Sequence, residues 1–309
     1  LGFNNDKSAE DIPGICFRSA NNEWKSTPKI VVDPEKTPIP DRSFFYQHRG
    51  KFNYLHFRPC AIVKTSYSCP HRCNFCYCCL LNEGKYLCRS VDNVVAEIAG
   101  IDCENIWIID DTFYLEHQRI KEFVRLLQEN GIKKNFILYY RADFIAENEE
   151  MIALLKSVGL KMVLVGLEAF DDETLQDFEK NTSTRINEKC LSILRKYDID
   201  CTALFVLDID AKKEDFHNLS RYVQKHRLRF STASILTPLP GTRQYDKYRD
   251  RITAHNPKQW DFLHLVAPPG QMGKWRFYLY FYRFYLQVLV MNLHWMMKSC
   301  LQGLFRRKA

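Results

Sequence analysis

No stretch of the sequence has the roughly 18 consecutive apolar residues that a membrane-spanning helix needs, so we predict no transmembrane helix. A strong excess of one charge is also missing, since the net charge is +7 over 309 residues. This balance permits an anionic partner such as RNA or a membrane surface but does not require one. We find no secretory signal peptide, so we expect free thiols in a reducing cytoplasm rather than a disulfide framework.

The sequence also lacks a second cysteine pair at the spacing that zinc knuckles and ribbons use. Three of its 12 cysteines, Cys69, Cys73 and Cys76, are instead separated by three and then two residues. His71 lies too close to its neighbours in a tight loop to complete a zinc site with them. Iron–sulfur clusters are usually held by four Cys thiolates, so a local trio predicts a cluster with one iron open to another ligand.

The spacing of these three cysteines resembles that of radical S-adenosylmethionine (SAM) enzymes. The resemblance implies a 4Fe-4S cluster whose fourth iron binds SAM. It further implies that the reduced cluster cleaves SAM to a 5′-deoxyadenosyl radical, which abstracts hydrogen from a substrate that the sequence does not identify. An electron donor such as flavodoxin or ferredoxin would supply the electron. The alternative from another class is a non-catalytic zinc or RNA-binding module.

Two segments near the start carry a second resemblance. Asp11-Ile-Pro-Gly-Ile-Cys-Phe-Arg18 and Pro38-Ile-Pro-Asp-Arg42 resemble the linker that joins an N-terminal cobalamin-binding domain to the catalytic domain in some radical SAM enzymes. The Asp-x-His-x-x-Gly stretch of such a domain is absent. The chain is therefore either a fragment or a family member without that domain. Cobalamin stays an open cofactor, and a cobalamin-dependent methyltransferase is an alternative function.

Apolar runs alternate with helical patterns through the middle of the chain. The runs at 61–65, 105–109, 136–140, 162–165, 202–207 and 230–236 predict six strands, and residues 91–99, 117–130, 149–158, 186–197 and 212–226 predict helices between them. This α/β pattern fits a doubly wound sheet or a curled one, and the resemblance implies a partial (βα)6 TIM-like barrel. We divide the chain into a lead-in (1–59), the barrel (60–254) and a C-terminal loop with an aromatic helix that covers the barrel (255–309).

Ligands of parallel α/β sheets bind at the carboxyl ends of the strands, and polar residues gather there in this sequence. Asp110 and Asp111 follow the second predicted strand, Arg141 the third and Glu168 the fourth. The acidic residues argue against RNA at this rim, so we expect no nucleic-acid partner. Helix capping by Asp110 and Asp111, or a surface ion pair between Arg141 and Asp143, is the alternative interpretation.

The demands of SAM and the family resemblance suggest a function for each rim residue. Asp110 or Asp111 would accept from the ammonium group, Arg141 would hold the carboxylate, and Glu168 would accept from the ammonium or the ribose hydroxyls. The family's usual Gly-Gly-acid form is missing before Asp111, so which Asp acts is open. The expected adenine contacts are the rings of Phe75 and Tyr77 and the backbone of Leu239 and Gly241.

Two features have no assigned function. Cys78, Cys79 and Cys88 would ligate a second cluster, pair by oxidation or pack as small apolar side chains. The densely aromatic segment 275–305 predicts a helix packed over the barrel. Its alternative is an interfacial helix that contacts a lipid-like substrate or the inner membrane surface.

Overall fold

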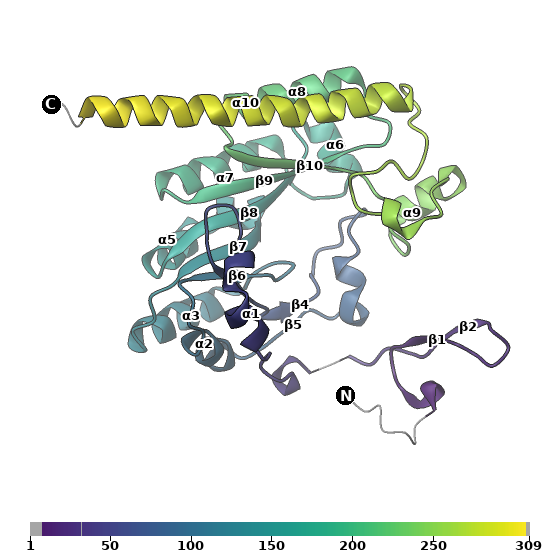
Figure 1. The fold of residues 1–309 in the computed structure, drawn as a ribbon, viewed down its shortest axis with the longest axis horizontal. Coiled ribbons are helices and arrows are strands. Elements are labelled where there is room, and N and C mark those ends of the chain that lie inside the picture. The colour runs from purple at the N-terminus through teal and green to yellow at the C-terminus, as the bar shows by residue number, and fades with distance from the viewer. Residues whose placement is uncertain (1–7, 32, 307–309) are drawn as a thin grey trace.

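The computed structural model describes residues 8–31 and 33–306, with side chains through Leu293, and is built around a six-stranded parallel sheet (Figure 1). The strands are β3 (Cys60–Val63), β6 (Asn105–Ile108), β7 (Asn135–Arg141), β8 (Leu160–Glu168), β9 (Asp200–Leu207) and β10 (Phe230–Ile235). Their spatial order follows the chain from β3 to β10, and each pairs in parallel with its neighbours. The sheet curls into half a barrel, which confirms the predicted fold class.

Helices return the chain between consecutive strands and lie on the outer side of the sheet (Figure 1). They are α2 (Val91–Ala99), α3 (His117–Glu129), α4 (Ala142–Glu147), α5 (Glu149–Ser157), α6 (Asp172–Asp177), α7 (Thr184–Lys196) and α8 (Lys213–Lys225). Side chains cap several of them, since Ser90 and Ser183 accept from backbone N–H groups in the first turns of α2 and α7.

The sheet buries side chains on both faces. Alternate strand residues, such as Val163 and Val165, face the helices and form the main core. The opposite, concave face has a smaller apolar layer made with lead-in residues. Tyr54 packs on Trp107 there, with ring centroids 4.3 Å apart, and Phe57 completes this floor of the half-barrel. The floor closes the end of the half-barrel opposite the carboxyl ends of the strands.

The lead-in contains a short hairpin, β1 (Cys16–Arg18) and β2 (Trp24–Ser26), followed by α1 (Ser43–Gln47). In the lead-in motif at residues 38–42, the last two residues make specific contacts with the rest of the protein. The Asp41 carboxylate accepts from the Ser43 N–H at 2.9 Å, at the start of α1. Arg42 pairs with the buried Glu97 of α2, which also pairs with Arg89. The motif thereby fastens the lead-in to the first helix of the barrel.

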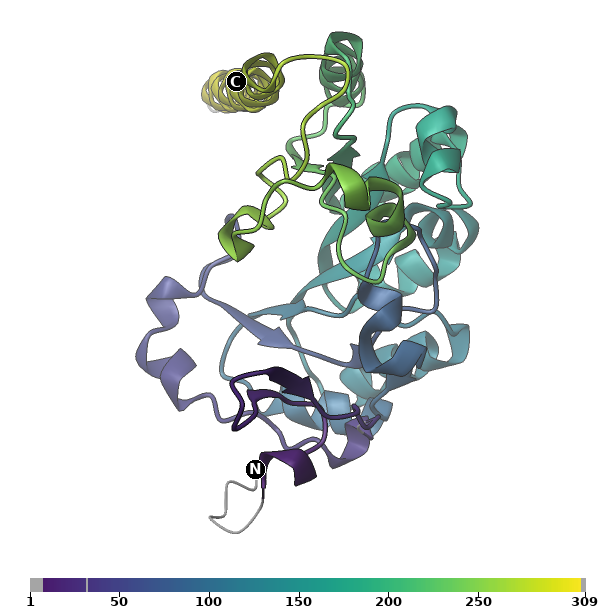
Figure 2. The same ribbon diagram turned by 90° about the vertical axis from the view of Figure 1, so that its right-hand side faces the viewer.

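After β10 come α9 (Arg243–Tyr248) and the long helix α10 (Lys274–Arg306), which runs beside α8 (Figures 1 and 2). The Tyr285 hydroxyl accepts from the Ala233 N–H and donates to the Ala233 carbonyl, which satisfies the free edge of β10. The Ile235 N–H donates to the Phe262 carbonyl at the same edge. Among the described residues, no helix combines the length and apolarity needed to cross a bilayer.

Candidate active site

The Cys loop follows β4 (Ser66–Tyr67), which pairs with β5 (Leu87–Cys88), and leads into the turn η4 (Cys78–Gly84). Cys69, Cys73 and Cys76 are free and partly exposed. The buried Asn74 between them fixes the loop. Its N–H donates to the Phe178 carbonyl at 3.3 Å, and its Oδ1 accepts from Gln244 Nε2 at 3.2 Å. The loop is therefore held by segments that follow β8 and β10.

The donor set of the loop fits an iron–sulfur cluster, since it supplies three thiols. No three His, Cys, Asp or Glu side chains in the part of the chain that the structure describes converge closely enough to hold a single metal ion. Burial raises the pKa of the Cys73 thiol, and the positive charges of Lys180 and Arg141 oppose this rise.

Arg141 lies at the end of β7 with its guanidinium largely buried. It donates to Asp143 through Nε and Nη2, to the Lys180 carbonyl through Nη2, and to Cys73 Sγ through Nη1 at 3.4 Å. Arg141 therefore does form the ion pair with Asp143, but this pair is largely buried rather than at the surface. Most Arg141 donors are already engaged, so the residue supports the Cys loop here, and its contact with a SAM carboxylate stays a prediction.

Glu168 ends β8 in a left-handed conformation with φ of 62°, where the pairing with β9 shifts register. Its Oε1 lies 2.5 Å from Lys180 Nζ, and both side chains are nearly buried. Gly166 makes room for this pair, because a Cβ there would lie 2.2 Å from Glu168 Oε1 and 2.8 Å from Lys180 Nζ. Sequence reasoning missed Lys180. The only local signal was a glycine inside a strand, which often marks a close approach.

The two neighbouring aspartates after β6 have different surroundings. Asp110 is 2% exposed, and its carboxylate accepts from the Thr65 N–H at 2.7 Å and the Ser66 N–H at 3.0 Å. Burial raises its pKa, and these hydrogen bonds oppose the rise. Asp110 therefore joins the end of β6 to the segment after β3. The helix-capping alternative does not describe this contact, because the accepted N–H groups belong to the β3–β4 connection.

The Oδ2 of the Asp111 carboxylate is buried and takes part in none of the described hydrogen bonds. The Cys78 thiol lies beside this carboxylate, and a hydrogen bond to Cys76, burial and the charge of Asp111 together raise the pKa of that thiol. Burial raises the pKa of the Tyr139 hydroxyl to about 12 and also raises that of Tyr77, and the charge of Asp111 adds to both shifts. The carboxylate therefore lies near both rings. Strand side chains alternate between the two faces of a sheet, so the sequence could have placed Asp111 on the same face as Trp107 and Asp110 on the opposite face.

The predicted adenine contacts are dispersed around the Cys loop. Phe75 packs against Phe178, with ring centroids 5.1 Å apart, and Tyr77 is 41% exposed. Gly241 has φ of 89°, and a Cβ there would lie 3.0 Å from a methyl carbon of Leu80 in η4. The segment from Leu239 therefore meets the Cys loop region across the top of the half-barrel. Whether these four residues contact adenine stays a prediction.

The end of β9 carries two more aspartates, which join the barrel to the tail. Asp208 accepts from the Tyr248 hydroxyl at 3.0 Å, and burial raises its pKa. Asp210 forms a bidentate pair with Arg251, both contacts at 2.7 Å, and also accepts from the Gly270 N–H. Hydrogen bonds from Arg251 lower the pKa of Asp210. These contacts fix the segment that precedes α10.

A half-barrel with a three-cysteine loop above its first strand, ringed by buried charges at the strand ends, defines a cluster-dependent α/β enzyme. Residues 63–223 match the radical SAM superfamily, and the chain belongs to this family. It is therefore an enzyme rather than the non-catalytic module that the sequence left open. The family implies a 4Fe-4S cluster and SAM, and the loop has three free thiols that would hold such a cluster.

Curated relatives include methyltransferases and cyclases. The chain is 26% identical over 259 residues to hopanoid C-3 methylase of Methylococcus capsulatus, which covers 84% of the chain and 49% of the relative. It is 22% identical to the anaerobic magnesium-protoporphyrin IX monomethyl ester cyclase of Synechocystis, over 89% of the chain and 56% of the relative. The chain thus spans about half the length of the curated relatives it matches.

Solved structures with a similar fold include cobalamin-dependent radical SAM enzymes. The apo structure of OxsB gives a TM-score of 0.65 at 17% identity, over 86% of this chain and 46% of OxsB. The methyltransferase TsrM of Kitasatospora setae, solved with cobalamin and a [4Fe-4S] cluster bound, gives 0.59 at 16% identity, over 81% and 52%. At these identities the likeness concerns the fold.

Proposed function

We propose that this chain carries the catalytic site of a radical SAM enzyme that methylates a carbon atom of a large, mainly apolar ring system, with cobalamin as a further cofactor. Relatives named for methylation of a hopanoid and of a bacteriochlorophyllide support the reaction class. Structural neighbours with bound cobalamin support the additional cofactor. The lead-in motif that resembles the linker of cobalamin-associated enzymes points the same way.

The observation that carries the proposal is the buried Oδ2 of Asp111, which takes part in none of the described hydrogen bonds. A buried acceptor without a donor is costly, and a cationic ligand would satisfy it. We assign Asp111 to the ammonium group of SAM. Lys180 holds the Glu168 carboxylate at the same rim, and Arg141 holds Cys73.

The cluster and SAM, when bound, supply the one-electron chemistry that an apolar carbon requires. The protein supplies the enclosure. Trp107, Tyr139 and Leu204 are partly buried on the concave face, and the indole N–H of Trp107 has no partner. Apolar and aromatic side chains of this kind suit a flat or fused ring system.

The test uses anaerobically reconstituted protein, added cobalamin and SAM labelled in its methyl group. We expect 5′-deoxyadenosine with wild-type protein, and label in an apolar ring substrate such as a hopanoid or a porphyrin. Asp111→Asn should raise the KM for SAM by about tenfold, since it exchanges a charged hydrogen bond for a neutral one. The proposal fails if SAM is cleaved while label never enters any such substrate and cobalamin has no effect.

Ring closure is the second candidate reaction, because cyclases are among the relatives. It predicts 5′-deoxyadenosine and a product without label from the SAM methyl group. For either reaction we propose flavodoxin or ferredoxin as the electron donor. The cytoplasm, where thiols stay reduced, is the proposed compartment.

A further inference from the structure

The helix α10 is apolar on two opposite faces. Phe277, Phe281, Phe284 and Val288 are buried against the body of the protein. A second row, which we call the outer stripe, is exposed at 51–89% of each residue. It consists of Trp275, Leu279, Tyr282, Leu286, Leu289, Val290 and Leu293. Steps of three and four residues, with Leu289 and Val290 side by side, place the row on one helical face.

The outer stripe is unusually large for a surface that meets only water. From Trp275 to Leu293 the helix rises by about 27 Å. Scattered exposed apolar residues are ordinary, whereas a contiguous row of this length marks a surface that contacts something apolar.

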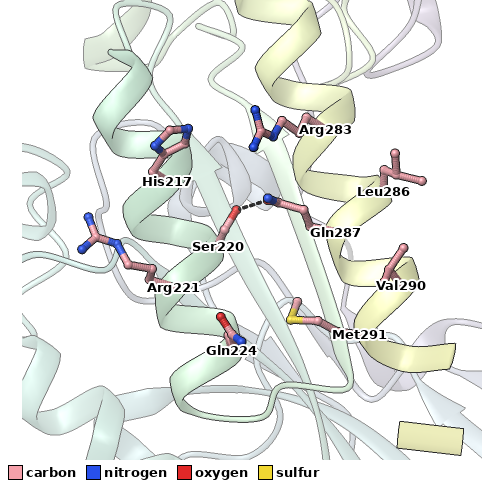
Figure 3. Close-up of a pocket in the computed structure, with 9 residues that line it drawn as sticks. All are labelled: His217, Ser220, Arg221, Gln224, Arg283, Leu286, Gln287, Val290 and Met291. Atoms are coloured by element: carbon pink, nitrogen blue, oxygen red, sulfur yellow. Dashed lines mark hydrogen bonds between the residues drawn. The ribbon is translucent and has the colours of Figure 1, made fainter. Parts of the chain in front are cut away.

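A groove beside the outer stripe is lined by positively charged as well as apolar side chains. It lies between α8 and α10 and has a volume of about 680 Å³ (Figure 3). Leu286, Val290 and Met291 form its α10 wall, and Ser220 bonds Gln287 at 2.7 Å between the helices. Arg283 and Arg221 also line it, from α10 and α8 (Figure 3). The groove thus combines an apolar wall with guanidinium groups.

The part of the chain that forms α10 carries charge of one sign only. No Asp or Glu occurs after Asp261, whereas Lys274 and the residues beyond it include seven Lys or Arg. Among the described ion pairs, none involves Lys274, Arg276 or Arg283. A second copy of this helix would bring like charges together, which disfavours self-association through the outer stripe.

We infer that the outer stripe and the adjoining groove dock on the surface of an anionic phospholipid bilayer. The apolar row would enter the boundary between head groups and acyl chains, and Arg276 and Arg283 would meet the phosphates. Trp275 and Tyr282 are the residue types that favour this boundary. The opposite apolar face of the helix is buried against the body of the protein.

Docking in this way would bring the site near the lipid. The first residues of α10 lie at the same end of the molecule as α9, whose Gln244 holds the Cys loop (Figure 1). Membrane docking would then place the strand ends beside a source of apolar substrate. This last consequence rests on the proposed function, whereas the docking itself does not.

Vesicle co-sedimentation tests the inference with the purified full chain, without SAM or reductant. We expect binding to vesicles of phosphatidylcholine mixed with phosphatidylglycerol, weak binding to phosphatidylcholine alone, and release by high salt. Arg276→Gln with Arg283→Gln should weaken binding by about thirtyfold, at about one kcal/mol for each charge. Leu279→Ser with Leu286→Ser should also weaken it, whereas Ile39→Ser, an equally exposed apolar control in the lead-in, should not.

These variants change exposed side chains, so circular dichroism should show an unchanged fold. The inference is overturned if the wild-type chain ignores anionic vesicles, or if the Leu and Ile39 variants bind alike. It is also overturned if the chain is a dimer that the Leu variant dissociates while neither form binds vesicles. Because the assay needs no turnover, its failure would leave the proposed reaction untouched, and a failed reaction would leave vesicle binding untouched.

Discussion

The buried pair of Glu168 and Lys180 gives the most demanding prediction. Lys180→Met removes the cation and leaves the Glu168 carboxylate, 12% exposed at its side chain, without its partner 2.5 Å away. Breaking a buried pair from one side costs about 3–5 kcal/mol of unfolding free energy. Adding Glu168→Gln removes the stranded charge, so the double variant should recover most of that loss.

Guanidinium-induced unfolding of the anaerobic apoprotein measures these differences. Lys247→Met is the matched control, because Lys247 pairs with Asp177 at 3.4 Å with both side chains about half exposed. Such a pair contributes about 0–1 kcal/mol. The reasoning is refuted if Lys180→Met and Lys247→Met destabilise equally, or if the double variant is as unstable as Lys180→Met alone.

Three further predictions concern neighbouring contacts. Asp110→Asn should lower the unfolding free energy by about 1–3 kcal/mol, because it disturbs the bonds to Thr65 and Ser66, whereas Asp111→Asn should leave stability nearly unchanged and weaken SAM binding. Chemical unfolding and equilibrium dialysis with SAM separate the two, and equal losses of stability would contradict the assignment. Tyr285→Phe should cost about 1–3 kcal/mol and speed hydrogen exchange at the Ala233 amide, since both bonds at the edge of β10 are lost; unchanged exchange would count against them. Arg251 lowers the pKa of Asp210 below its ordinary 3.8, so the stability from this pair is present above that pH and is lost as the pH falls through the lowered value. Unfolding of Arg251→Met across this acid range should therefore show a weaker decline than wild type, and an identical decline would exclude the linkage.

Much of the fold could be predicted because the barrel units repeat strong local signals. The helical spacing of the apolar residues and the glycine that follows them predict α2 with its observed bounds, and the ends of the predicted strands lie within three residues of the observed ones. Short elements could not be predicted from the sequence. The helix α4 has six residues directly after β7, too few for a periodic pattern, and the hairpin of β1 and β2 has three residues in each strand.

The site was only partly predictable, because its charges are paired through tertiary contacts. The Cys spacing is a local signal, and strand ends identify Arg141 and Glu168. Lys180 comes 12 residues after Glu168, and the two meet because the chain turns back through α6 between them. A local sequence pattern does not show this contact. Cys78, Cys79 and Cys88 are free and partly exposed in the structure, which assigns them no further function.

The most direct test of the central claim is reductive cleavage of SAM by the anaerobically reconstituted chain. With about four irons per chain, wild-type protein and reductant should produce 5′-deoxyadenosine and methionine. Cys73→Ala should abolish both the cluster and the cleavage, and Cys88→Ala should retain them. A reconstituted protein that binds zinc, forms no 5′-deoxyadenosine, or loses its cluster equally in both variants would contradict the account.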